Sequence, residues 1–199
     1  MDDAASEEPD VKTPAKLGRR APEQRRAAVV AAARDLFLAQ GVEATSVDAI
    51  ARRAGVAKGT VYLSFPTKQH LVRAIEEEFD ALILDRLHAA TATSPLDAAT
   101  AAAAWCTALV EASLDNLEVH DFLFYGKGAR VAERAVDATL SADLAGVLRD
   151  RGVTDAEDVA VFLIGGVTAL ADLAILRQDD DRAGLLGMVE RFVTAAVGA

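Results

Sequence analysis

The chain has 199 residues and a formal net charge of −10, and 52% of its residues are apolar while only 5% are aromatic. That apolar content is ample for a real core in one domain or two small ones, and the abundant alanine favours helices over sheets. The single cysteine, Cys106, excludes an internal disulfide and any metal site that needs several cysteines.

Residues 1–20 form a polar, proline-containing arm that we expect to be flexible. Its first ten residues are acidic and lack the apolar segment of a signal peptide, which predicts a cytoplasmic protein. Lys16, Arg19 and Arg20 then supply positive charge. A basic arm of this kind can reach a DNA minor groove, although a flexible tail without function has the same composition.

Residues 21–66 are predicted to form a three-helix domain built on a helix-turn-helix. A first helix, from about residue 23, carries an apolar stripe and ends at Gly41. Ser46 can cap the second helix, and Gly55 can end it, because glycine adopts the left-handed conformation without steric cost. The third helix then runs over residues 58–65. Its buried side is predicted to consist of Ala57, Val61 and Phe65.

The positive charge of the chain is concentrated on this domain. Residues 11–75 contain twelve Lys or Arg against four Asp or Glu, whereas residues 76–199 contain nine against twenty-two. A basic segment that coincides with a helix-turn-helix on an otherwise acidic chain predicts binding to nucleic acid. A solvated basic face without a partner is the alternative that charge alone leaves open.

Residues 24–72 carry many short motifs in one register. After an alanine-rich first helix they are Leu36-Phe37, Gly41, Thr45-Ser46-Val47, Ile50-Ala51, Ala54-Gly55-Val56, Gly59-Thr60-Val61-Tyr62, Phe65, Lys68 and Leu71. In these motifs the segment resembles the DNA-binding domain of the TetR family of bacterial transcriptional regulators. The chain departs from many members at Leu63 and Ser64, where a histidine or another ring-bearing residue is common.

The resemblance implies which groups face DNA. Thr45 and Ser46, at the start of the second helix, would offer hydroxyl and backbone N–H groups to a phosphate, and capping alone is the alternative. Lys58 and Lys68 would place positive charge at the duplex, and Gly59 would let the helix backbone come close to it. The remaining candidates are Thr60 at base edges, Tyr62 at a phosphate, and Ser64.

Residues 67–199 are predicted to form an all-helical domain for effector binding and dimerisation. Periodicity and breaks indicate helices over about 68–90 and 96–117, one that ends near 149, and two more over 156–176 and 183–197. In the TetR family the first of these helices joins the two domains. The resemblance therefore implies that tilting it changes the distance between paired DNA-binding domains.

The resemblance also implies an effector pocket among the middle helices, for a ligand that is partly apolar and carries a few polar groups. Plain core packing is the alternative for every candidate wall residue. The candidates are Phe79, His88, Trp105, Cys106, Leu109, His120, Phe122, Phe124 and Tyr125.

The last two helices are the most apolar of the chain. No residue between Val159 and Ala171 is charged, and these thirteen residues are too short to cross a bilayer of about 30 Å. A helix that is apolar all round needs burial all round, either in an ordinary core or, as the resemblance favours, in a homodimer. The expected interface residues are Phe162, Gly165, Gly166, Ala169, Leu173, Leu185, Val189, Phe192 and Val193.

The predicted function is a ligand-responsive transcriptional regulator, in first place a repressor that binds a near-palindromic operator as a homodimer and leaves it when a small-molecule effector binds. The alternative is a helical small-molecule-binding or interaction protein without specific operator binding. An enzyme has less support than either. His70, His88 and His120 lack the spacing of metal ligands or a catalytic triad, and no metal or cofactor site is expected.

Overall fold

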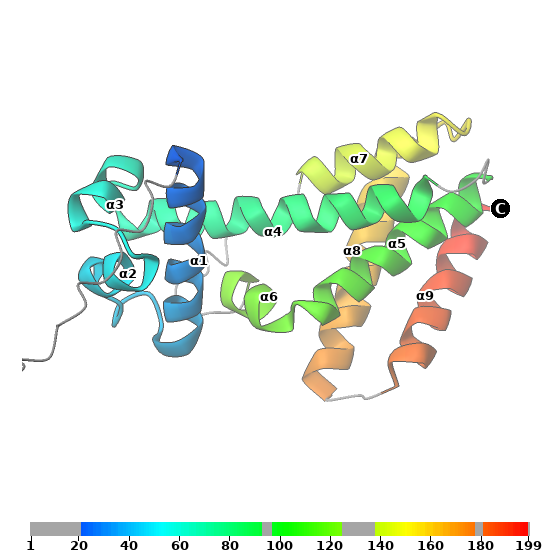
Figure 1. Cartoon of the computed structure of the whole chain (residues 1–199). Helices are drawn as coiled ribbons and strands as arrows, with labels where there is room; N and C mark the ends of the chain where they lie inside the picture. Colours follow the sequence, from blue (N-terminus) through cyan, green and yellow to red (C-terminus); the bar gives the residue numbers. More distant parts are fainter. Residues whose placement is uncertain (1–20, 93–96, 125–137, 178–180, 199) are drawn as a thin grey trace, which may run out of the picture.

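The computed structural model describes residues 21–92, 97–124, 138–177 and 181–198, and every regular element among them is an α-helix. The predicted all-α class is therefore confirmed. The predicted arm, residues 1–20, and the pocket candidate Tyr125 lie outside the described residues. Figure 1 shows a small cluster of helices at one end of the long helix α4 and a larger bundle around its other end.

The small cluster consists of α1 (Pro22–Gln40), α2 (Val47–Ala54) and α3 (Lys58–Ser64). Both predicted signals of α2 are present, because the Ser46 hydroxyl accepts from the Ala49 N–H at 3.2 Å and Gly55 is left-handed with φ 69°. Val61 and Phe65 are buried as predicted. Ala57 is exposed instead, because it precedes the first turn of α3 and does not lie on its buried side.

The larger bundle contains α4 (Lys68–Thr91), α5 (Ala98–Asp115), α6 (Leu117–Phe124), α7 (Ala138–Arg149), α8 (Ala156–Arg177) and α9 (Arg182–Val197). The helix predicted to reach residue 117 is interrupted at Asn116, where φ is −122°. The Asn116 amide donates to the Ala112 carbonyl at 2.8 Å, so it satisfies the end of α5. The short helix α6 that follows was not predicted.

Two apolar cores result, one in each part of the molecule. The first joins α1–α3 to the beginning of α4, so Leu71, Ala74 and Ile75 pack with the helix-turn-helix. The second fills the bundle around the fully buried Trp105. α6 lies between them, and Val119 and Leu123 pack against both cores. The two parts are therefore joined by α4, which contributes to both cores, and by the side of α6 that carries Val119 and Leu123.

Candidate functional site

The helix α3 presents one buried side and one exposed side. Val61 is fully buried, whereas Tyr62 is 46% exposed and Leu63 is 88% exposed. The sequence candidates Lys58, Gly59 and Ser64 are exposed as well, and Thr60 is half-buried. The predicted contact residues of this helix and Leu63, which was not among them, therefore form its outward side, where one charged and one apolar side chain stand among small and hydrogen-bonding groups.

Neither the backbone conformation nor a close contact among the described residues requires a glycine at position 59. It is exposed in ordinary helical backbone, and a Cβ added there would meet nothing within 4 Å. A glycine in a helix costs roughly 0.5–1 kcal/mol relative to alanine. The open space in front of Gly59 is what a close approach of another molecule to the helix backbone requires.

Lys58 is held by a carboxylate from the preceding helix. Its ammonium donates to Asp48 at 2.8 Å, with both side chains about half exposed. This hydrogen bond, followed by the charge of Asp48, raises the pKa of Lys58, so the ammonium stays charged. A phosphate that bound Lys58 would have to compete with Asp48 for it.

Thr45 and Ser46, at the start of α2, differ in exposure: Ser46 is exposed and Thr45 is buried. Ser46 is exposed while it caps the helix, so capping and a contact outside the chain are compatible. Thr45 is only 2% exposed, and its hydroxyl donates to the Gly41 carbonyl at 2.7 Å. The predicted phosphate contact of the Thr45 hydroxyl is corrected on this geometry, because the group is turned into the protein.

Lys68 fastens the first turn of α4 to the loop before α2. Its ammonium donates to the carbonyls of Val42 at 2.7 Å and Glu43 at 3.2 Å, and the Thr45 carbonyl lies 3.4 Å away. The phosphate contact of Lys68 stays a prediction. The observed contacts give Lys68 a further role, which is to hold the helix-turn-helix on α4.

Several other cations of this part of the molecule are paired. Arg53 bonds Asp35 of α1 at 2.6 Å, while Arg26 and Arg34 of α1 reach Glu77 and Glu78 of α4 at 3.8 and 3.9 Å. The Arg26 guanidinium also lies 5.1 Å from the centre of the Phe65 ring. These contacts were missed from the sequence, because they join residues far apart in the chain. They link α2 to α1 and α1 to α4 on the surface of the molecule.

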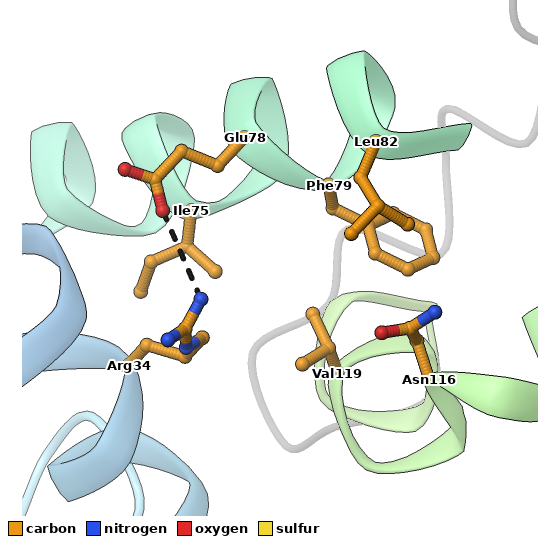
Figure 2. A pocket seen from close by; sticks show the side chains of 7 residues that line it. All are labelled: Arg34, Ile75, Glu78, Phe79, Leu82, Asn116 and Val119. Atoms are coloured by element: carbon orange, nitrogen blue, oxygen red, sulfur yellow. Dashed lines mark ion pairs between the residues drawn. The ribbon is translucent and has the colours of Figure 1, made fainter. Parts of the chain in front are cut away.

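A shallow pocket lies where α1, α4 and the α5–α6 junction meet. Figure 2 shows Arg34 and Glu78 pointing toward one another on one side of it, with Asn116 and Val119 facing α4 on the other. The accessible volume of the pocket is only about 50 Å³, and the pocket is partly open to solvent. Its lining residues are Arg34, Ile75, Glu78, Phe79, Leu82, Asn116 and Val119.

Most predicted wall residues of the effector pocket do not line this pocket, and Phe79 is the one it shares with the prediction. Trp105, Cys106 and Leu109 are packed in the bundle core. The rings of Phe79, His120 and Phe124 form one cluster, with His120 and Phe124 centroids 4.9 Å apart. Phe122 is corrected, because it packs against the other core through Phe37.

His88 lies on the surface, with 59% of its side chain exposed, and does not join this aromatic cluster. Its Nε2 is 2.7 Å from one carboxylate oxygen of Asp143, and the other oxygen accepts from Trp105 Nε1 at 2.7 Å. Asp143 therefore joins α4 and α5 to α7. It was missed because its role depends on two residues that are 38 and 55 positions away.

The outer face of α8 is exposed and apolar. Phe162 is 73% exposed, Leu173 40% and Leu176 77%, and Ala169 is exposed between them. A Cβ at Gly165 or Gly166 would meet nothing within 4 Å. Within the single chain only the side of α8 that carries Leu163, Ile164 and Val167 is in the core, so the ordinary-core alternative does not give burial all round, and burial in a homodimer stays a prediction.

The predicted interface residues of α9 fall into two groups, one exposed to solvent and the other packed in the chain's own core. Phe192 is 64% exposed, but Val189 and Val193 are fully buried in the chain's own core and Leu185 packs against it. Val189 and Val193 are corrected, because the chain's own core covers them completely, while the prediction for the partly buried Leu185 stays open. Phe192 and the outer residues of α8 remain as candidates for an interface.

The length and composition of α8 also satisfy the criteria for a membrane span. It has 22 residues, and its most apolar window has a mean hydropathy of 2.3 with 28% buried. The sequence estimate counted only the uncharged part of this helix. Core helices of water-soluble proteins share this length and composition, so these two properties do not identify a membrane span.

Among the described residues no cluster of three His, Cys, Asp or Glu is arranged to hold a metal.

Residues 29–75 match the family model described as bacterial regulatory proteins, tetR family. A segment of 53 residues is 42% identical to the HTH-type transcriptional regulator SrpR of Pseudomonas putida. That match covers 27% of this chain and only 25% of SrpR. The match therefore spans about a quarter of each protein.

The similarity to solved structures extends over most of the chain. A TetR-like transcriptional regulator from Rhodococcus sp. RHA1 superposes with a TM-score of 0.62 over 92% of this chain and 100% of that one, at 20% identity. A transcriptional regulator from Aquifex aeolicus VF5 gives a TM-score of 0.64 over 86% and 99%, at 17% identity. At these identities the likeness concerns the fold.

Proposed function

Because the chain belongs to the TetR family of bacterial transcriptional regulators, we propose that it binds a near-palindromic operator as a homodimer and is released by a small-molecule effector. The single observation that carries this proposal is the outward surface of α3. Its exposed groups are backed by a buried Val61, and the adjoining Gly59 faces open space. A short helix exposed in this way fits the width of a DNA major groove.

The helix-turn-helix would approach DNA with α3 in the groove and the start of α2 at the phosphates. Tyr62 is exposed enough for its hydroxyl to reach a phosphate, and Ser46 is exposed beside the free N–H groups of α2. Lys58 would exchange the carboxylate of Asp48 for a phosphate. Binding that depends on such exchanges should weaken steeply with salt.

Dimerisation would place two such surfaces on one duplex. The exposed apolar face of α8, with Phe162 and Leu176 most exposed, and Phe192 of α9 offer a surface that a second copy can bury. Two copies related by a twofold axis present two α3 helices to successive major grooves about 34–36 Å apart. An inverted-repeat operator follows from that symmetry.

The effector would act through the junction between the two parts. The pocket lined by Phe79 and Val119 lies between α4 and α6, next to the aromatic cluster of Phe79, His120 and Phe124. A partly apolar ligand bound among these helices would favour one arrangement of α4 and α6 over another. If the favoured arrangement misplaces the α3 helices, DNA affinity falls by the ligand's differential affinity for the two arrangements.

A helical small-molecule-binding protein without a defined operator is the second candidate. It is favoured by the ion pairs of Lys58, Arg53, Arg26 and Arg34, which neutralise much of the positive charge near the helix-turn-helix. Such a protein would bind DNA weakly and without preference for sequence. The two candidates therefore differ in the ratio of specific to random binding.

The deciding experiment is a binding titration of the full chain with duplexes from its own upstream region and with random duplexes of equal length, at moderate salt. Specific binding that is at least about 1,000-fold tighter than random binding supports the operator. Tyr62→Phe should weaken it by about tenfold, because one hydrogen bond to a charged phosphate is lost. Glu118→Gln, on the exposed face of α6, is the matched control. Equal affinity for both duplexes favours the second candidate.

A further inference from the structure

We infer that Leu63 sets part of the sequence specificity through apolar contact with the C5 methyl group of a thymine in the major groove. The inference rests on the proposed function, since it requires α3 to enter that groove. Leu63 is 88% exposed, the highest value among the exposed large apolar side chains of the described residues. Nothing within the described chain covers it, although exposure of a leucine is unfavourable.

The position of Leu63 directs it outward from the middle of the α3 surface. It follows Gly59 by four residues and Thr60 by three, which puts all three on one side of the helix. Gly59 has no side chain, and a Cβ placed there would meet no other atom of the chain within 4 Å. A broad surface such as a groove floor can therefore reach the backbone at Gly59 and the methyl groups of Leu63 at the same time.

The chemistry of leucine decides what it can recognise there. The side chain has no donor and no acceptor, so it cannot bond the N7, O6, N6 or N4 atoms of the other base edges. The apolar group that a base pair presents in the major groove is the methyl of thymine. Contact with that methyl favours an A·T pair in one orientation at the position below Leu63.

The electrostatic surroundings favour DNA over an apolar protein partner. Lys58 lies on the same short helix, and the described residues 21–75 carry eight Lys or Arg against four Asp or Glu. The exposed apolar face of α8 lies in the acidic remainder of the chain. The helix-turn-helix part thus keeps more cations than anions even though Lys58 is paired with Asp48, and an exposed leucine beside this cation matches a polyanion that has methyl groups in its groove.

The test starts from a duplex that the full chain itself selects from a random pool, so no operator needs to be known. Each thymine of the selected duplex is replaced in turn by deoxyuridine, which removes one methyl group and keeps the base pairing. At one or two positions we expect the wild-type chain to lose about three- to fivefold in affinity, as for one buried methyl. Leu63→Ala should bind the unmodified duplex more weakly and should not respond at those positions.

Tyr62→Phe is the matched variant of the neighbouring residue. It should weaken binding overall and keep the wild-type response to deoxyuridine. A wild-type chain that ignores every replacement, or a Leu63→Ala chain that responds like wild type, overturns the inference and leaves the operator intact. If Leu63→Ala changes only the oligomeric mass, the side chain is a protein contact and the inference is wrong. A pool without any selected sequence refutes the proposed function and the inference together.

Discussion

The ring of Phe122 in α6 stacks on the ring of Phe37 in α1, with the centroids 6.1 Å apart and the planes inclined by 25°. Phe37 is buried in the core of the helix-turn-helix part, and α6 belongs to the bundle. The stack is therefore a direct apolar contact between the part that would bind DNA and the part that would bind an effector. Val119 and Leu123 extend the same contact.

Phe122→Leu should loosen this contact without removing the apolar character of the site. We expect the free energy of unfolding to fall by about 1 kcal/mol, because a half-buried ring loses part of its packing. Operator affinity should change little, while its response to an effector should weaken. Chemical denaturation and binding titrations with and without an effector measure both. An unchanged effector response would show that α6 does not carry the coupling through Phe122.

Gly59→Ala should raise the stability of the domain and lower its affinity for DNA. The new methyl group meets no atom of the chain, so the domain should gain roughly 0.5–1 kcal/mol of stability from the better helix former. DNA affinity should fall by at least about tenfold, since a methyl group then stands between helix and duplex. Gly146→Ala in α7 is the control, because its Cβ also meets no atom and α7 lies in the bundle. Unaltered DNA affinity in Gly59→Ala would show that α3 does not approach the duplex closely there.

The ion pair between Lys58 and Asp48 should limit DNA affinity. Asp48→Asn removes a negative charge 2.8 Å from the ammonium, and we expect binding to tighten by about two- to fivefold at low salt. Lys58→Ala should weaken binding and lower the slope of log affinity against log salt by about one. A slope that is the same in wild type and Lys58→Ala would mean that this ammonium does not bind a phosphate.

The exposed face of α8 and α9 should mediate dimerisation. Phe162→Glu and Phe192→Glu each put a charge on a surface that the second copy would bury, and twofold symmetry doubles the effect. The dimer should weaken by at least about tenfold, measured by sedimentation, with unchanged helical content. Ala89→Glu, on an exposed position of α4, serves as the control. A dimer that survives both phenylalanine substitutions must use another surface.

Cys106 should report on opening of the bundle core. Burial raises the pKa of this thiol from 9.0 to about 12, so it is protonated and shielded at neutral pH. A thiol reagent should label it only as fast as the core opens. Rapid labelling of the native chain at pH 8 would contradict the buried position.

The same shift predicts how stability depends on pH. The pKa of the folded thiol lies above its unfolded value, so its contribution is complete below pH 9 and is lost as the pH rises toward 12. The loss is about 1.4 kcal/mol per pH unit in that range. The advantage of wild type over Cys106→Ala in denaturation should therefore shrink above pH 9. An advantage that stays constant up to pH 10.5 would contradict the shift.

The sequence by itself determined the helical class, the helix-turn-helix and the resemblance of that segment to the TetR family. These features depend on local physics, namely the spacing of apolar residues, the cap at Ser46 and the left-handed turn at Gly55. The outward residues of α3 could be predicted for the same reason. A short helix with one buried stripe has only one side left to expose.

Only the tertiary structure decided which apolar stripe faces which neighbour. Val189 and Val193 look like interface residues in sequence, but their stripe packs into the chain's own core, while Phe162 is left outside. Thr45 and Phe122 were likewise reassigned by contacts with Gly41 and Phe37. Periodicity identifies an apolar face but cannot say which neighbour covers it, because that depends on how distant helices are placed against one another.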